Sequence, residues 1–556
     1  MPAPDVAALV AAAASDHPER LAVVEAGGRG MTWSELDDEV SRFASGLGEA
    51  GIVAGHRVML AMGNRLEFVT GYLGVLRAQA VAVPVNPGST ADELGRMLAD
   101  SGARMVLADP ETIGAVRRAV AGSERPVSVV AVGPDPEPGE RSYDELRTAA
   151  VRMVPPLPDP EKLAVLLFTS GTSGVPRAAM LTHRALLANI DQVASVAPPM
   201  IHSDDVVLGV LPLFHVYGLN AVLGGVIRHR AKLVLTERFD PEGTLDLIED
   251  EACSVVPVAP PVFAHWRGVD ALAERLGPVR LVLSGSAPLS ADVVEEFTAR
   301  AGVPVHQGYG LTEAAPVVTS TLISVGHAPG SVGAPLPGIG LRLVDEEGVP
   351  LVDAEAADPG EIQIRGDNLF SGYWPDGSDG PGPDGWWSTG DVGVLDANGD
   401  LHLVDRVKEL IIVSGFNVYP SEVEAVVEEV DGVHSAAVIG VEDELTGEAV
   451  VAYVVPDDAD RDPAALAAAV ADLCAVRLAR FKRPVRVEVV EELPRTATGK
   501  VRKGWLRGED RRRALGLLEP TPRRSSPPPG GPDLGGDRES LSSGEQRRGD
   551  PGGRGE

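Results

Sequence analysis

The chain has 556 residues, enough for several domains with large apolar cores, and its formal net charge is −32. An acidic balance this strong argues against nucleic acid and anionic lipid surfaces as partners. No apolar stretch has the length of a transmembrane segment and no secretory leader is evident, so we expect a cytoplasmic protein. The two cysteines, Cys253 and Cys474, are far apart in sequence, which argues against a disulfide framework or a zinc site.

Strand-like and helix-like runs alternate from Asp5 to about Val404. This alternation predicts a layered α/β architecture for the first four hundred residues. The strand candidates are residues 57–61, 80–84, 105–107 and 206–210, and the helix candidates are residues 6–15 and 33–47.

The pattern changes near residues 405–408. Shorter runs follow, which predict a separate small α+β domain ending near Leu515. The compact α and β runs are residues 422–429, 435–441, 449–455, 463–478 and 485–490. The remaining segment, 516–556, is rich in Pro, Gly, Ser and Arg, and its composition predicts a disordered tail.

A polar loop follows the apolar run 163–168. Clustered backbone N–H groups, hydroxyls and glycines can form a nest for phosphate oxygens, although the spacing is not that of the common P-loop. The alternative is an ordinary polar surface turn. The loop residues are Thr169, Ser170, Gly171, Thr172, Ser173 and Gly174, followed by one cation, Arg177.

Four further segments place polar groups in apolar surroundings: LVLSGSAPL (281–289), HQGYGLTE (306–313), STGD (388–391) and RTATGKVRK (495–503). Singly, each has an ordinary explanation as a turn, a helix cap or a solvated charge. The chain has only six lysines against 43 arginines, so a lysine on a Thr/Gly turn, Lys500, is notable. All five segments in one chain, in this order, favour a functional site over five ordinary turns.

These motifs resemble those of the adenylate-forming (ANL) superfamily, which includes acyl-CoA synthetases, and the chain is most similar in pattern to bacterial fatty acid–CoA ligases. The resemblance covers the chain to about Leu515. It implies a multi-layer α/β fold, with a large N-terminal domain (1–404) of stacked sheets and helices, a hinge (405–408) and a small mobile α+β cap domain (409–515). It also implies that a carboxylate reacts with ATP to give acyl-AMP, from which the coenzyme A thiol displaces AMP.

The resemblance also implies roles for individual residues. Glu313 would ligate Mg²⁺, Thr312 would contact the α-phosphate, and Lys500 would lie between the carboxylate and the α-phosphate. Asp391 and Arg406 would bind the ribose, and Lys408 would be the pivot of the hinge. The adenine would be lined by Gly285, Ser286, Ala287, Pro288, Gln307, Gly308, Tyr309 and Gly310; the β- and γ-phosphates would be held by the loop from Thr169 to Gly174 and by Arg177; Ser414, Gly415 and Phe416 would border the coenzyme A tunnel.

The segment LPLFHVYGLN (211–220) resembles an acyl-pocket wall, with His215, Tyr217 and Leu219 as its candidate residues. It holds no aspartate to bind an ammonium group, which disfavours amino acid substrates. We therefore expect a medium- or long-chain fatty acid. Alternatives are an aryl acid of the cinnamate type, a ligase that loads a carrier protein, and a non-catalytic acyl- or nucleotide-binding relative.

Two segments of the chain depart from the family pattern. Arg177-Ala178 replaces the usual Lys-Gly, which preserves the charge and requires a negative φ at residue 178. The segment 372–386, GYWPDGSDGPGPDGW, replaces a helical segment of the family with residues of very poor helix propensity. It predicts a flexible surface loop.

Overall fold

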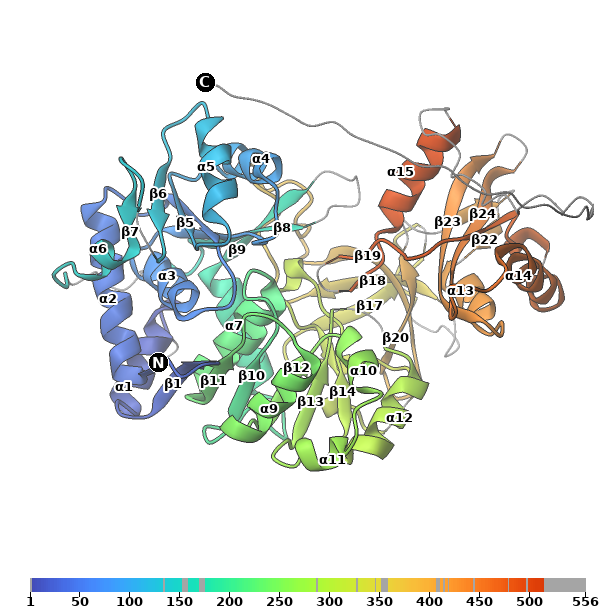
Figure 1. Cartoon of the computed structure of the whole chain (residues 1–556), viewed down its shortest axis with the longest axis horizontal. Coiled ribbons are helices and arrows are strands. Elements are labelled where there is room, and N and C mark those ends of the chain that lie inside the picture. The colour runs from blue at the N-terminus through green and yellow to red at the C-terminus, as the bar shows by residue number, and fades with distance from the viewer. Residues whose placement is uncertain are drawn as a thin grey trace, which may run out of the picture. The chain divides into compact units, whose positions relative to one another are not determined.

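A computed structural model gives the fold of the chain (Figure 1), which divides into two compact units, Met1–Glu509 and Asp510–Glu556. The account below concerns the first unit. The structure describes residues 3–133, 136–152, 159–169, 176–286, 289–326, 329–345, 347–351, 359–406, 411–413, 416–418, 420–443, 446–478, 480–496 and 499–514.

The first large sheet has seven strands in the order β7-β6-β5-β3-β4-β8-β9. All neighbours are parallel except β8 and β9, which form an antiparallel hairpin. The strands are β3 (Arg57–Ala61), β4 (Val81–Pro84), β5 (Met105–Ala108), β6 (Ser128–Ala131), β7 (Arg141–Ser142), β8 (Leu163–Thr169) and β9 (Arg177–Thr182).

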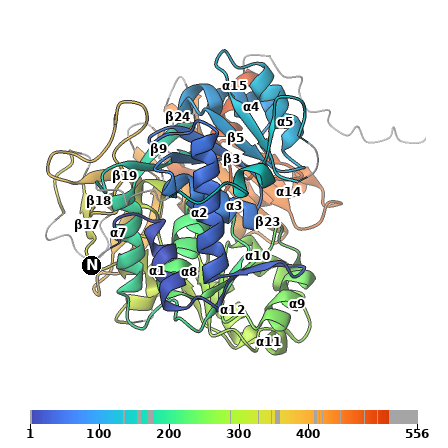
Figure 2. The same ribbon diagram turned by 90° about the vertical axis from the view of Figure 1, so that its left-hand side faces the viewer.

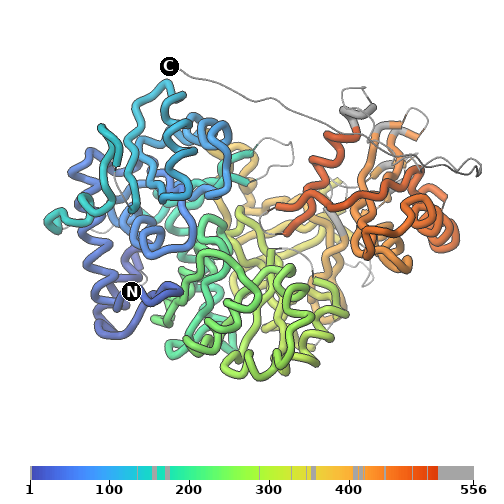
Figure 3. Tube along the Cα trace, in the orientation of Figure 1, coloured from blue at the N-terminus to red at the C-terminus, as the bar shows by residue number. Residues whose placement is uncertain are grey.

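The second large sheet also has seven strands, in the order β14-β13-β12-β10-β11-β1-β2. The N-terminal hairpin supplies its edge, because β1 pairs in parallel with β11; Figure 3 shows this dark-blue segment entering the green part of the chain. The strands are β1 (Leu21–Glu25), β2 (Gly30–Thr32), β10 (Val206–Gly209), β11 (Lys232–Leu235), β12 (Val255–Val258), β13 (Leu281–Ser284) and β14 (Val305–Gln307).

Helices cover both faces of each large sheet. Alternate residues of β3 show this directly: Val58 and Leu60 belong to the central core, whereas Met59 and Ala61 face an outer core. The central layer contains α1 (Ala8–Asp16), α2 (Trp33–Glu49), α3 (Leu66–Arg77), α6 (Tyr143–Arg147), α7 (His183–Ala194) and α8 (Gly225–His229); the outer layers contain α4 (Ala91–Ser101) and α5 (Ile113–Ala121) on the first sheet, and α9 (Pro241–Glu251), α10 (Pro261–Trp266), α11 (Leu272–Arg275) and α12 (Ala291–Ala301) on the second.

Helix ends follow local sequence rules. Thr32 and Glu35 form a capping box at the start of α2, and Thr90 and Glu93 form another at α4. Figure 2 shows α2 beside α3. The two helices approach closely because Gly74 has no side chain: an added Cβ would lie 2.7 Å from the Phe43 ring.

Smaller antiparallel sheets follow in the chain. One pairs β15 (Thr319–Ser320) with β16 (Ala334–Pro335), and another has the order β17-β18-β19-β20. Its strands are β17 (Gly340–Val344), β18 (Gly360–Arg365), β19 (Trp387–Leu395) and β20 (Leu401–Arg406).

A mixed sheet built from residues after 410 has its own apolar core, which includes Val423, Val450 and Val470. Its path is β22-β21-β24-β23, and β25 pairs in parallel with β24. The elements are β21 (Ile411–Val413), β22 (Phe416–Val418), α13 (Pro420–Glu428), β23 (Val433–Asp443), β24 (Gly447–Pro456), α14 (Pro463–Arg477), β25 (Arg486–Val489) and α15 (Lys503–Ala514). In the part of the chain that the structure describes, no helix has the length and apolar character to cross a bilayer.

Candidate active site

The predicted phosphate loop joins β8 to β9. Thr169 and Arg177 are register partners at the end of this hairpin next to the loop, and the Thr169 hydroxyl donates to the Arg177 carbonyl oxygen at 3.5 Å. The predicted residues Ser170, Gly171, Thr172, Ser173 and Gly174 lie outside the described residues. Ala178 is buried within β9 and has an extended strand conformation, so the replacement of glycine at this position is compatible with the backbone.

The Arg177 side chain contacts the segment 372–386. Its guanidinium donates to Asp379 Oδ2 at 2.6 Å and to Ser378 Oγ at 3.1 Å. It also lies over the Tyr373 ring, 3.9 Å from the ring centroid. Sequence reasoning missed Tyr373, Ser378 and Asp379; the only signal was that the family pattern changes at Arg177 and in this segment together.

Tyr373 links this cation to the predicted metal ligand. Its hydroxyl donates to Glu313 Oε1 at 2.6 Å, and Glu313 is buried, with only 8% of its surface exposed. Burial, followed by the Glu313 charge, raises the pKa of Tyr373. The hydroxyl therefore stays protonated and acts as a donor at neutral pH.

The segment 372–386 is not helical, as predicted, and several contacts anchor its first residues, while its flexibility stays a prediction. Its backbone extends the edge of β9: Trp374 N–H donates to the Ala178 carbonyl at 2.8 Å, and Met180 N–H donates to the Gly372 carbonyl at 3.1 Å. The indole of Trp374 donates to the Asp100 carbonyl at 3.0 Å. Poor helix propensity was a correct signal, whereas tertiary anchoring could not be inferred from it.

Glu313 lies in a tight turn after β14. Thr312 and Glu313 belong to the 3₁₀-helix η2 (Thr312–Ala314). Two glycines permit the close approach of chain segments that shapes the turn. A Cβ added at Gly308 would lie 2.7 Å from the Thr319 carbonyl oxygen, and one added at Gly310 would lie 2.4 Å from the Pro316 carbonyl oxygen.

The structure brings together the predicted adenine and ribose residues. The Tyr309 hydroxyl donates to Asp391 Oδ2 at 2.6 Å, and both residues are buried. Asp391 on β19 is the register partner of Arg406 on β20, so the two predicted ribose residues are cross-strand neighbours. Parallel pairing of Ser284 with Gln307 places the end of β13 beside the end of β14.

The turn after β13 meets the predicted acyl wall. An added Cβ at Gly285 would lie 2.8 Å from the Tyr217 ring, so only glycine fits there. Ser286 has a φ of +74°, an unusual conformation of the kind found at functional turns. Ala287 and Pro288 lie outside the described residues. The predicted adenine turn and acyl wall therefore share a boundary at the Tyr217 ring.

The wall itself contains a π-helix, η1 (Tyr217–Gly224), of a type that often occurs at functional sites. Asn220 anchors it by donating to the Leu186 carbonyl at 3.1 Å and to the Ala315 carbonyl at 2.6 Å. Leu219 is buried, and burial lowers the pKa of His215 to about 4. His215 is therefore neutral at pH 7, and its Nδ1 accepts the Tyr217 N–H at 3.3 Å.

The predicted C-terminal residues are described only in part. Lys408, Ser414 and Gly415 lie outside the described residues, and Phe416 begins β22. Lys500 follows Gly499, which has a φ of +83°, and its backbone N–H donates to the Thr496 hydroxyl at 3.1 Å. This local turn agrees with the Thr/Gly pattern of the sequence.

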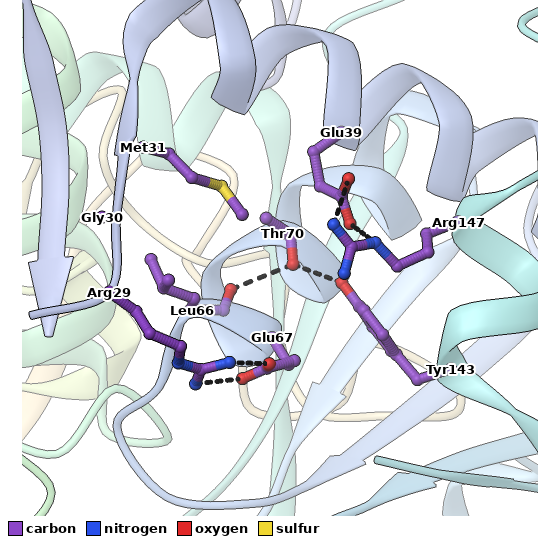
Figure 4. A pocket seen from close by; sticks show the side chains of 9 residues that line it. All are labelled: Arg29, Gly30, Met31, Glu39, Leu66, Glu67, Thr70, Tyr143 and Arg147. Carbon is purple, nitrogen blue, oxygen red and sulfur yellow. Dashed lines mark hydrogen bonds and ion pairs between the residues drawn. The ribbon is translucent and has the colours of Figure 1, made fainter. Parts of the chain in front are cut away.

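A cavity of about 300 Å³ lies elsewhere, between β2, α2, α3 and α6 (Figure 4). Its charges are paired across the pocket: Arg29 with Glu67, and Arg147 with Glu39. The Tyr143 and Thr70 hydroxyls are bonded to each other. None of the predicted site residues lines this cavity, and its paired charges give it no excess charge to attract a phosphate.

Family models decide the classification. The model described as "AMP-binding enzyme" matches residues 10–374, and "AMP-binding enzyme C-terminal domain" matches residues 422–500. The chain belongs to the AMP-binding enzyme family. It is an adenylate-forming enzyme of the acyl-CoA synthetase type, and ATP-dependent, AMP-forming acid–thiol ligation is the activity of this group.

Relatives with different substrates are similarly close. A 4-coumarate–CoA ligase-like protein of Oryza sativa subsp. japonica is 34% identical over 89% of this chain and 91% of its own length. A long-chain-fatty-acid–CoA ligase of Yersinia pestis is 33% identical over 87% of this chain and 90% of its own. The ATP-bound structure of MatB from Rhodopseudomonas palustris has a TM-score of 0.82 and 33% identity, covering 91% of this chain and 99% of that one.

Proposed function

We propose that the protein activates a medium- or long-chain fatty acid with ATP, forming acyl-AMP and pyrophosphate, and then transfers the acyl group to coenzyme A with release of AMP. The observation that carries the substrate assignment is the uncharged wall formed around His215, Tyr217 and Leu219. His215 is neutral at pH 7, burial raises the pKa of Tyr217 so that its phenol stays protonated, and Leu219 is 1% exposed. Such a wall favours an acid with an apolar, uncharged tail.

For the nucleotide, we propose that Tyr309 and the turns at Gly285–Ser286 and Gln307–Gly308 line the adenine, and that Asp391 and Arg406 bind the ribose. The Tyr309–Asp391 hydrogen bond and the Asp391–Arg406 pairing support this arrangement. Thr312 would contact the α-phosphate. Thr169, the loop 170–174 and Arg177 would hold the β- and γ-phosphates at the end of the β8–β9 hairpin.

Mg²⁺ fits this site as part of the nucleotide complex. Among the residues that the structure describes, no group of three or more His, Cys, Asp or Glu side chains could hold a metal by itself. Glu313 offers a single buried carboxylate, and Mg²⁺ is commonly held by one or two carboxylates together with substrate phosphates and water. The metal would neutralise phosphate charge when bound.

Lys500 would lie between the carboxylate and the α-phosphate, where one ammonium attracts and orients both anions. We assign residues 1–404 to the catalytic domain, 405–408 to a hinge centred on Lys408, 409–515 to a cap domain, and 516–556 to a tail. The separate core of the sheet β21–β25 and the second family match support this division. Ser414, Gly415 and Phe416 would border the path of coenzyme A.

An aryl acid is the second candidate, and the 34% identity to a 4-coumarate–CoA ligase-like protein favours it. A planar ring would also suit an uncharged wall that contains the Tyr217 phenol. The two candidates differ in shape: a fatty acid needs a long narrow space, whereas a cinnamate needs a short flat one.

The test measures pyrophosphate release and thioester formation in parallel, over fatty acids of graded length and a cinnamate, with and without coenzyme A. A Lys500→Ala variant is the control, in which we expect adenylation to fall by about 10²–10³-fold. Thioester formation with a clear chain-length optimum supports the proposal. Preference for the cinnamate moves the assignment to an aryl acid, pyrophosphate release without thioester indicates a carrier-protein acceptor, and inactivity on all acids contradicts the proposed function.

A further inference from the structure

The residues 370–374 contact both Glu313 and the strand that begins with Arg177. Phe370 N–H donates to the Glu313 carbonyl oxygen at 2.9 Å, and Trp374 N–H donates to the Ala178 carbonyl at 2.8 Å. Tyr373 lies between these two attachments. Its ring packs edge-on against Phe370 with centroids 5.0 Å apart. Backbone hydrogen bonds on both sides of Tyr373 therefore hold its side chain in place.

The Tyr373 side chain has two polar contacts in this position. The Arg177 guanidinium lies 3.9 Å from its ring centroid, and its hydroxyl donates to Glu313 Oε1 at 2.6 Å. A cation over the ring face withdraws electron density, which makes the phenolic O–H a better donor. The bond to a carboxylate is charge-assisted, and such bonds are short and strong.

We propose that Tyr373 is a positioning residue, which holds the Glu313 carboxylate in the orientation that ligates nucleotide-bound Mg²⁺ and at the same time seats Arg177 at the phosphate site. The proposal rests on the proposed function. It assigns a specific task to the segment 372–386: it couples the predicted metal ligand to the predicted phosphate cation.

The hydroxyl and the ring have separable tasks. The hydroxyl acts on Glu313 and hence on the metal, whereas the ring acts on Arg177 and hence on the phosphates. Tyr373→Phe removes the first contact and retains the second, and Tyr373→Leu removes both. Groups that orient a metal ligand typically contribute about 10- to 100-fold to metal affinity.

The experiment is calorimetric titration of the full-length protein with an ATP analogue whose α,β bridge is a methylene group, AMPCPP, which cannot transfer its AMP group, at a series of free Mg²⁺ concentrations. In Tyr373→Phe we expect the Mg²⁺ concentration that half-maximally enhances analogue binding to rise by about 10- to 100-fold, with little change in binding without metal. In Tyr373→Leu we expect metal-free binding to weaken as well. High Mg²⁺ should restore adenylation by Tyr373→Phe, which a structural defect would not allow.

Tyr143→Phe is the matched control, because it also removes a hydrogen-bonded tyrosine hydroxyl, the one bonded to Thr70 in the separate cavity (Figure 4). We expect its Mg²⁺ dependence to equal that of the unmodified protein. If Tyr373→Phe also titrates like the unmodified protein, or if both variants shift equally, Tyr373 does not position Glu313. If the unmodified protein does not bind AMPCPP at any Mg²⁺ concentration, the proposed function fails along with this inference.

Discussion

The Asp379 carboxylate forms an ion pair with the Arg177 guanidinium, the group that the proposed function assigns to the triphosphate. ATP must then displace this carboxylate, and Asp379→Asn removes the competing charge. Asp379 has a φ of +55°, a conformation that asparagine tolerates well, so the variant retains the loop backbone. We expect Asp379→Asn to bind ATP more tightly than the unmodified protein does.

The structure sets the size of the effect. The Arg177 and Asp379 side chains are 34% and 70% exposed, and exposed ion pairs contribute about 0.2–1 kcal/mol. At about 1.4 kcal/mol per tenfold change, the KM for ATP should fall roughly 1.4- to 5-fold. The difference should shrink as salt is added, because salt screens exposed charges.

The assay is pyrophosphate release at saturating acid, with ATP titrated at low and high ionic strength. Asp384→Asn is the matched control, since it removes the same charge from the same loop, where Asp384 accepts the Trp386 N–H at 3.3 Å. An unchanged or higher KM in Asp379→Asn would refute competition. An equal fall in the control would attribute the effect to the general negative field of the loop.

Three further predictions concern nucleotide binding and stability. Tyr309→Phe removes the 2.6 Å hydrogen bond to buried Asp391, so ATP affinity measured by calorimetry should fall at least about tenfold. Unchanged ATP affinity would mean that the adenine binds elsewhere. Folding stability should fall as pH drops from about 6.5 towards 4, because the folded state holds the pKa of His215 near 4 while the unfolded chain takes up the proton. The maximal slope is about 1.4 kcal/mol per pH unit. Thermal unfolding of His215→Gln over the same pH range should show a smaller loss of stability. Asp205→Ala leaves Arg280 without the carboxylate to which its Nε donates at 2.9 Å. Chemical denaturation should show that the free energy of unfolding falls by about 3 kcal/mol, the lower end for a buried pair because Arg280 is partly exposed. A fall below about 1 kcal/mol would contradict this reasoning.

The layered fold followed from local patterns. Residues 57–61 form β3 within the same bounds, and the helix expected over 33–47 runs slightly further, to Glu49. Apolar runs and capping residues act over a few positions, so the sequence displays them directly. The order of strands in the two seven-stranded sheets was not predicted, because pairing β1 with β11 depends on contacts across two hundred residues.

The candidate site was predicted from motifs, and contacts between motifs were not. Tyr309 and Asp391 were both candidates, yet their hydrogen bond joins residues 82 positions apart. The contacts of Arg177 with Ser378 and Asp379 span about two hundred residues and depend on how a loop packs along β9. A composition rich in Gly, Pro and Asp indicates that a segment is not helical, but it carries no information on what that segment touches.

The π-helix at Tyr217–Gly224 gives the substrate wall a particular evolutionary property. A π-turn contains one residue more than an α-turn, and each residue of an α-helix is rotated by about 100° from the next. Deleting one residue from this segment would restore α-helical winding and turn the flanking side chains to new directions in a single event. Tyr217, which lies against Gly285, would leave that position without being substituted. Enzymes that share this scaffold can therefore exchange the side chains facing an acid by gaining or losing one codon, a larger step than point substitution provides.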